Sequence, residues 1–135
     1  MPVKVILDSN FLMLFPRFLG DLLEELDKTI GRRTERIVLR PVFDELKRIS
    51  MDDARKTRNQ AEIVLKIVEK GDFKIVDVAL KPMETVDELI VRTAETWKCP
   101  VATNDRELRR RLIEVGVPVV YLRQRNRLEI KGKYS

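Results

Sequence analysis

Residues 3–12 read VKVILDSNFL, and this stretch indicates the class of fold. The mostly aliphatic run from Val3 to Leu7 predicts a short buried strand. Asp8 follows directly, where the strand passes into the next element. Its carboxyl group either caps the following helix, a common use of Asp, or belongs to a functional site. Which of the two applies depends on where the other acidic residues fall.

Short apolar runs and helical stretches alternate along the rest of the chain. Further strands are expected at residues 36–40, 73–76, 100–103 and 117–122, and helices at 11–28 (broken near Pro16), 41–49, 53–70, 85–98 and 105–115. The second part of the first helical stretch would be lined by Leu19, Leu22, Leu23 and Leu26. This alternation predicts an α/β fold with a parallel sheet covered by helices on both faces. Ligands of such sheets bind beyond the carboxyl ends of the strands, which is where Asp8 stands.

Composition restricts the chemistry of the chain. Its 135 residues include no His and one Cys, Cys99. The lack of His excludes Ser-His-Asp triads, His acid–base catalysis and His-bound zinc or haem. A single Cys excludes an intramolecular disulfide and a cysteine zinc site. Any catalysis must then use carboxylates, Lys or Arg, hydroxyls, or a metal bound by oxygen, and Mg²⁺ or Mn²⁺ suits such a site.

Glu45 is an acidic residue on an otherwise apolar helix face. In the sequence PVFDELKRI (41–49), residues 42, 45, 46 and 49 fall on one face of a helix, and the other three are apolar. The neighbouring Asp44 points away from that face. A carboxylate on a buried face costs several kcal/mol unless it is paired or bound to a metal. Glu45 therefore has either an Arg or Lys partner or a metal ion.

Two more acids each stand at the start of the inward-facing side of a predicted helix. Asp87 is followed at helical spacing by residues 90, 91 and 94, and Asp105 by residues 108 and 112, all apolar. Each also has an ordinary explanation. Thr85 and Glu88 have the spacing of a capping box, which makes Asp87 a first-turn acid that favours the helix dipole. Asn104 and Glu107 have the same capping-box spacing.

Capping and pairing do not explain four inward acids together in a chain without His. Four carboxylates at one site repel one another and cannot all stay ionised without cations. A divalent metal supplies that charge, and it suits the attack of activated water on a phosphodiester. The net charge of +5, from 27 Lys and Arg against 22 Asp and Glu, fits a polyanionic substrate.

At these acids the sequence resembles the PIN-domain ribonuclease family. The matching segments are the strand with Asp8-Ser9-Asn10, then PVFDEL (41–46), VDELI (86–90) and ATNDREL (102–108). The resemblance spans about residues 3–123. It implies a single PIN-like domain with a five-stranded parallel sheet in the order 3-2-1-4-5. It also implies Mg²⁺- or Mn²⁺-dependent endonucleolytic cleavage of single-stranded RNA.

Matching by position, the resemblance implies that one or two metal ions are bound by the catalytic acids Asp8, Glu45, Asp87 and Asp105. It further implies supporting roles for Asn10, Thr103 and Asn104. Glu88 stands beside Asp87, but a helix rotates it by about 100° from the inward line, which favours Asp87 as the third acid. Ser9 stands where the family has Thr, and the hydroxyl is kept.

The resemblance leaves the biological setting open. The archaeal branch that resembles ribosomal-RNA-processing endonucleases is the most similar, and VapC-type toxins share the same acids. The corresponding partners are precursor ribosomal RNA, an antitoxin or a ribosome-assembly protein, and a second copy of the chain in a homodimer. A non-catalytic RNA-binding or ribosome-assembly factor with the same fold is the alternative from another class. A phosphoryl-receiver or dehalogenase-like phosphatase is disfavoured because Asp8 lacks the acidic neighbours those sites need.

Basic residues indicate where RNA would lie. The candidates are Arg32 and Arg33 in a loop, and Arg106, Arg109 and Arg110 after the Asp105 loop. The 109–111 run follows the Asp105 loop, so at least one of its guanidinium groups is expected to face the acidic crevice. Arg suits bidentate contact with phosphate better than Lys. The domain is expected to span residues 1–123. Residues 124–135, which include Lys131 and Lys133, are expected to form a basic tail that is either a hairpin strand or disordered.

The sequence shows no visible signal peptide and no apolar run near the roughly 18 residues of a membrane span, so a cytoplasmic protein is expected.

Overall fold

The computed structural model describes residues 2–18 and 21–132. The expected helix residue Leu19 and the tail residue Lys133 lie outside these ranges. Within them, no helix is long and apolar enough to cross a membrane.

The strands form one sheet in the order β3-β2-β1-β4-β5-β6. Neighbouring strands are parallel from β3 through β5, and β6 runs antiparallel to β5. This confirms the expected α/β class and the 3-2-1-4-5 order. The bounds of the strands are β1 Val3–Leu7, β2 Thr34–Leu39, β3 Lys74–Val76, β4 Val101–Ala102, β5 Val119–Gln124 and β6 Arg127–Lys131.

The sixth strand comes from the segment that we predicted to be a basic tail. The boundary expected at residue 123 falls inside β5, and β6 pairs with β5 through a turn at residues 125–126. Leu128 of β6 is 5% exposed and belongs to the hydrophobic core. Pairing with β6 satisfies backbone groups that β5 would otherwise present at an open edge. Of the two forms considered for the tail, the described residues adopt the hairpin strand.

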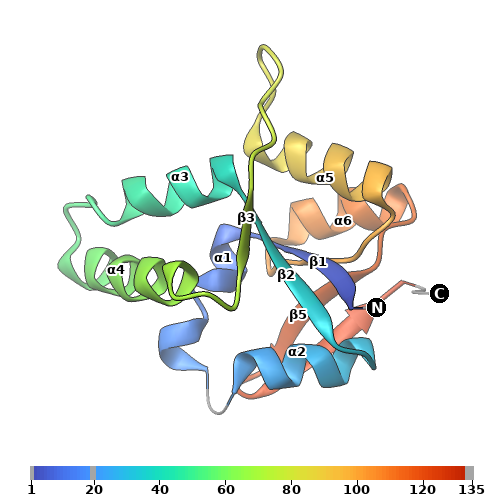
Figure 1. Ribbon diagram of the computed structural model, residues 1–135, viewed down its shortest axis with the longest axis horizontal. Coiled ribbons are helices and arrows are strands. Elements are labelled where there is room, and N and C mark those ends of the chain that lie inside the picture. Colours follow the sequence, from blue (N-terminus) through green and yellow to red (C-terminus); the bar gives the residue numbers. More distant parts are fainter. Residues whose placement is uncertain (1, 19–20, 133–135) are drawn as a thin grey trace.

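Helices flank the sheet on both sides. Figure 1 shows α3 and α4 on one side of β2 and β3, and α5 and α6 on the other. The break near Pro16 is confirmed, because a short 3-10 helix containing this proline separates two α-helices. The helices are α1 Ser9–Leu12, the 3-10 helix η1 Phe15–Arg17, α2 Leu22–Ile30, α3 Arg40–Ile49, α4 Arg55–Glu69, α5 Val86–Trp97 and α6 Arg106–Glu114.

The central strands position the candidate site. Strands β1 and β4 are adjacent and parallel, with Leu7 opposite Ala102, and both residues are fully buried. The two chains therefore leave the sheet side by side at the same edge. Asp8 follows β1 there and Thr103 follows β4, which brings residues 95 positions apart in sequence into direct contact.

Candidate active site

Asp8 is a buried carboxylate held from both sides. Its side chain is 4% exposed, accepts the Ser9 N–H at 2.8 Å and accepts the Thr103 hydroxyl at 2.7 Å. Its own N–H donates to the Ala102 carbonyl at 3.0 Å. Asp8 thus caps α1, as one reading of the sequence proposed, and it is also fixed to the end of the neighbouring strand.

Asn10, Thr103 and Asn104 link the ends of three strands. The Asn10 Oδ1 atom accepts the Asn104 N–H at 3.0 Å and lies 3.2 Å from the Thr103 hydroxyl. The side-chain Oδ1 of Asn104 accepts the Leu122 N–H of β5 at 2.8 Å. The Asp105 N–H donates to the Thr103 hydroxyl at 3.1 Å. The three residues expected to support the site therefore form one hydrogen-bonded network around Asp8.

Glu45 reaches this edge from α3. Its carboxylate accepts the hydroxyl of Ser9, and it has no ion pair in the described part of the chain. The Arg or Lys partner that the sequence allowed is therefore not present among the described residues. Asp44, next to it, is exposed as expected. The role of Ser9 is a contact that the sequence analysis did not identify, although a hydroxyl directly after the strand-terminal acid was its signal.

Asp87 and Asp105 complete the set from the starts of two helices. Asp87 lies half-buried in the first turn of α5, and the expected Thr85–Glu88 capping box is present. Asp105 is the N-cap of α6 and accepts the Leu108 N–H at 3.0 Å. The alternative of a capping box between Asn104 and Glu107 is not formed, because Asp105 is the N-cap and the Asn104 side chain is bonded to β5.

The electrostatics place these acids in one neighbourhood. Burial raises the pKa of Asp8 to about 6, and the negative charges of Asp87 and Glu45 add to the rise against the hydrogen bonds from Thr103 and Ser9. Burial also raises the pKa of Asp87, with further contributions from the charges of Asp105 and Glu45. The four carboxylates therefore influence one another electrostatically, and their role as one metal-binding site stays a prediction.

The donor set of this cluster suits a hard divalent cation. All four candidate ligands are carboxylates, as Mg²⁺ and Mn²⁺ prefer, and Asp8 is buried among like charges. Across residues 2–18 and 21–132, no three acidic side chains stand close enough to hold an ion together. Hydrogen bonds to Ser9, Thr103 and the α6 backbone hold the carboxylates in separate positions. The residues therefore suit such a metal by their chemistry and charge, but their carboxylates do not converge on a single position in this structure.

The arginines of α6 differ in what they face. Arg111 lowers the pKa of Asp87 by its positive charge. It is therefore the arginine of the 109–111 run whose charge acts on the acids. Arg109 lies over the ring of Tyr121, 4.4 Å from its centroid. Arg110 forms ion pairs with Glu107 and Glu114 on its own helix. Arg106, Arg109 and Arg110 also line a pocket of about 300 Å³ with Lys131 of β6.

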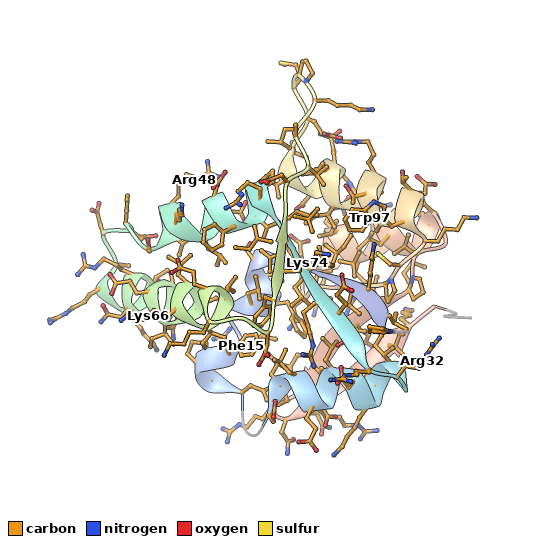
Figure 2. All side chains as sticks on the ribbon, in the orientation of Figure 1. Phe15, Arg32, Arg48, Lys66, Lys74 and Trp97 are labelled. Carbon is orange, nitrogen blue, oxygen red and sulfur yellow. The ribbon has the colours of Figure 1, made fainter. Side chains whose placement is uncertain are left out.

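Arg32 and Arg33 lie at the other end of the sheet. Both precede β2, and the Arg33 carbonyl accepts the Val3 N–H at the start of β1. Arg32 lines a pocket that also contains Trp97, and Figure 2 shows it beyond α2, far along β2 from α3. The five residues of β1 separate this end from Asp8, about 16 Å at the usual rise per residue. The structure therefore does not bring these two arginines to the acidic edge.

Comparison with known proteins identifies the family. A model described as a PIN-like domain matches residues 5–125. Ribonuclease VapC4 of Methanocaldococcus jannaschii is 29% identical over 96% of this chain and 97% of its own length. Ribonuclease VapC9 of Archaeoglobus fulgidus is 27% identical over 93% of this chain and 87% of its own length.

Solved structures agree with this assignment. The structure of the PIN domain endonuclease Utp24 has a TM-score of 0.80 and 25% sequence identity, covering 99% of this chain and 95% of that one. A domain of a functionally unknown Methanocaldococcus jannaschii protein shares the fold, with a TM-score of 0.63 and 15% identity over 98% of this chain and 99% of that one. The chain therefore belongs to the PIN-like domain family, as the resemblance of its four acidic segments to PIN-domain ribonucleases predicted.

Proposed function

We propose that this chain is an endoribonuclease that cleaves single-stranded RNA with Mg²⁺ or Mn²⁺ held by Asp8, Glu45, Asp87 and Asp105. One observation carries the proposal: a carboxyl group that is 4% exposed, with a pKa near 6, lies in the field of two other acids. Such a group destabilises the folded chain at neutral pH unless a cation offsets it. A divalent cation is the partner that the carboxylate set would accept.

The metal, when bound, supplies activation of water and stabilisation of the charge that develops on the phosphate. The protein residues hold the acids for that purpose. The Thr103 hydroxyl and the Ser9 N–H fix the two oxygens of Asp8, and the Ser9 hydroxyl directs Glu45 toward the same edge. Asn10 ties the segment after β1 to the segment after β4, which limits how far Asp8 and Asp105 can separate.

A polyanionic substrate is supported by the net charge of +5 and by the pocket that Arg106, Arg109 and Arg110 line on α6. Phosphates of the RNA strand would lie along this helix, where the positive charge of Arg111 already acts on Asp87. Arg32 and Arg33 would contact only a substrate long enough to pass around the sheet.

Two cellular settings have support. Both curated relatives, named ribonucleases VapC4 and VapC9, align over nearly the whole chain, which favours a toxin with an antitoxin partner. The PIN domain endonuclease Utp24 has the same fold over 99% of the chain, which favours endonucleolytic cleavage. The second setting, the processing of ribosomal RNA precursors, rests on the sequence resemblance to the archaeal branch. A toxin would arrest growth when it is expressed alone, and co-expression of its protein partner would relieve that arrest. A processing enzyme would leave growth intact and cut a defined RNA site. The expected homodimer is part of either proposal and is checked by analytical ultracentrifugation.

The nuclease proposal is tested by incubating end-labelled single-stranded RNA with the chain in Mn²⁺, in Mg²⁺ and in EDTA. Cleavage is expected only with a divalent metal. Glu45→Gln is expected to reduce the rate by at least about a hundredfold, since it removes a charged ligand while still accepting from Ser9. Asp44→Asn is the matched control, because this exposed neighbour on α3 points away from the site.

Equal loss of activity in both variants would show that the Glu45 effect is not local to the site. RNA binding without cleavage under every metal condition, unchanged in Asp8→Asn, would instead support the non-catalytic RNA-binding or ribosome-assembly alternative.

A further inference from the structure

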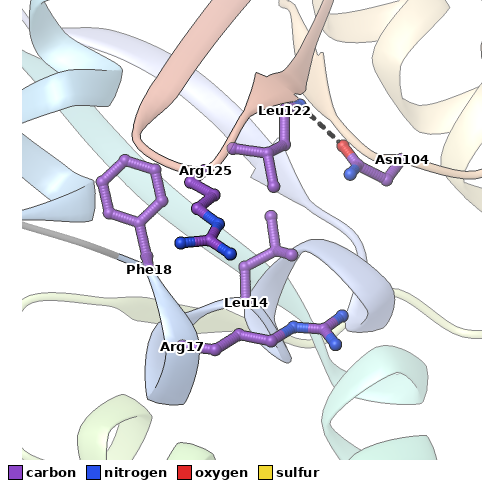
Figure 3. Close-up of a pocket in the computed structure, with 6 residues that line it drawn as sticks. All are labelled: Leu14, Arg17, Phe18, Asn104, Leu122 and Arg125. Carbon is purple, nitrogen blue, oxygen red and sulfur yellow. Dashed lines mark hydrogen bonds between the residues drawn. The ribbon is translucent and has the colours of Figure 1, made fainter.

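A concave site lies beside the acidic edge. It is a pocket of about 390 Å³, a size typical of small-ligand sites. Figure 3 shows its lining, which comes from three separate parts of the chain: Leu14, Arg17, Phe18, Asn104, Leu122 and Arg125. None of these residues belongs to the carboxylate cluster.

The pocket shares its wall with the carboxylate site. Asn104 lines it and directly precedes Asp105, and the Asn104 N–H is bonded to Asn10, two residues after Asp8. The segment that carries Leu14 continues from the helix that Asp8 caps. A ligand that spans both places would therefore follow one continuous edge of the sheet.

The lining has an apolar floor and two cationic side chains. Leu14 is 3% exposed and Leu122 is half-buried, and both side chains are aliphatic. Figure 3 shows the guanidinium group of Arg125 directed between Phe18 and Leu14, with Arg17 along the lower rim. Within the described residues neither Arg17 nor Arg125 forms an ion pair, and no acid lines the pocket.

Asn104 adds a hydrogen-bond donor to this surface. The Leu122 N–H can only donate, so the side-chain atom of Asn104 that receives it must be the amide oxygen. The NH₂ end of the amide is therefore turned toward the pocket, as Figure 3 shows. It would meet a ligand acceptor, which every nucleobase carries on at least one edge.

We propose that this pocket holds one nucleobase of the RNA strand next to the phosphodiester bond that is cleaved, an inference that rests on the ribonuclease function proposed above. A flat base stacks on the ring of Phe18 and the guanidinium plane of Arg125, as single-stranded RNA bases do on aromatic and Arg side chains. Arg17 at the rim contacts the adjoining phosphate. The pocket thereby sets which bond of the strand reaches the carboxylates.

The test uses short RNAs with one fluorescent pyrrolocytosine placed at successive positions, bound to the Asp8→Asn chain in EDTA. One position is expected to change its fluorescence at least about threefold more than the others, because only that base enters the pocket. Phe18→Leu and Arg125→Gln are each expected to remove this position-specific response. The readout needs neither metal nor cleavage.

Matched controls come from the same segments. Phe15→Leu changes an aromatic side chain of η1 that packs against Phe73 instead of lining the pocket, with ring centroids 5.7 Å apart. Arg127→Gln removes an exposed charge two residues from Arg125. Both controls should keep the position-specific signal. Circular dichroism melting checks that Phe18→Leu folds, and the exposed Arg125 provides a test that does not depend on the core.

The cleavage assay separates this inference from the proposed function. With the active chain, an abasic nucleotide at the same position should slow cleavage by about tenfold, the order expected from the loss of one stacked base. That penalty should disappear in Phe18→Leu. A uniform fluorescence response with active cleavage would overturn the base pocket and leave the nuclease intact. A position-specific response without cleavage in any metal would uphold the pocket and overturn the nuclease.

Discussion

Replacing Asp8 with Asn should make the metal-free protein more stable at neutral pH. The carboxyl group has a pKa of about 6 in the folded chain against an ordinary value of 3.8. A rise of that size corresponds to about 3 kcal/mol of lost stability once both states are ionised. Because Asp8 is 4% exposed, solvent screening removes little of this cost, and the neutral amide avoids it.

The hydrogen bonds around residue 8 can adjust to the amide. The amide oxygen keeps the Ser9 N–H, and the NH₂ group turns toward the Thr103 hydroxyl. That hydroxyl now accepts, and its own proton turns to Asn10, whose Oδ1 already lies 3.2 Å away. No buried polar group is left without a partner, so about 3 kcal/mol is the upper limit of the gain. A domain of this size would then melt about 10 °C higher.

The pH dependence has a definite sign. Between about pH 4 and pH 6 the folded chain binds more protons at Asp8 than the unfolded chain, so wild-type stability falls as pH rises through that window. The advantage of Asp8→Asn should therefore be small near pH 4, grow up to about pH 6 and stay constant above it. Urea unfolding followed by circular dichroism in EDTA measures this difference directly.

Two comparisons complete the experiment. Asp44→Asn, which changes an exposed acid, should show no such pH-dependent difference. Millimolar Mn²⁺ should stabilise the wild type and leave Asp8→Asn nearly unchanged. If Asp8→Asn proves less stable than the wild type at pH 7 without metal, the reasoning from burial and like charge is wrong.

The remaining predictions concern single contacts. Thr103→Val should cost about 1–3 kcal/mol in urea unfolding, since it strips a hydrogen bond from buried Asp8 and leaves a backbone N–H unpaired; a neutral result would contradict the network. Ser9→Ala should change stability by less than about 1.5 kcal/mol but weaken Mn²⁺ binding in calorimetry by releasing Glu45; unaltered affinity would refute that role. Leu128→Ala should cost about 2–4 kcal/mol because β6 is part of the core, whereas a separate tail would tolerate it without loss.

The order of elements and the candidate acids follow from local sequence. Period-two and helical patterns are set by neighbouring residues, so the five parallel strands, the break at Pro16 and the inward line of Asp87 were predictable. The identity of the four acids depended on the same patterns together with the lack of His. The sixth strand was left open, because a short basic segment such as 127–131 pairs only when an edge strand is available.

The sequence by itself determined which functional groups are available: carboxylates, hydroxyls and many cationic side chains, with no imidazole and a single thiol. The tertiary structure decided which of these groups meet. In the folded chain Thr103 donates to Asp8 and Ser9 donates to Glu45. Arg32 lies at the opposite end of the sheet. The Asn104 side chain bonds to β5 instead of capping a helix. The physical reason is that hydrogen bonds and charge effects act over a few ångströms, and only strand pairing brings residues 8 and 103 within that range.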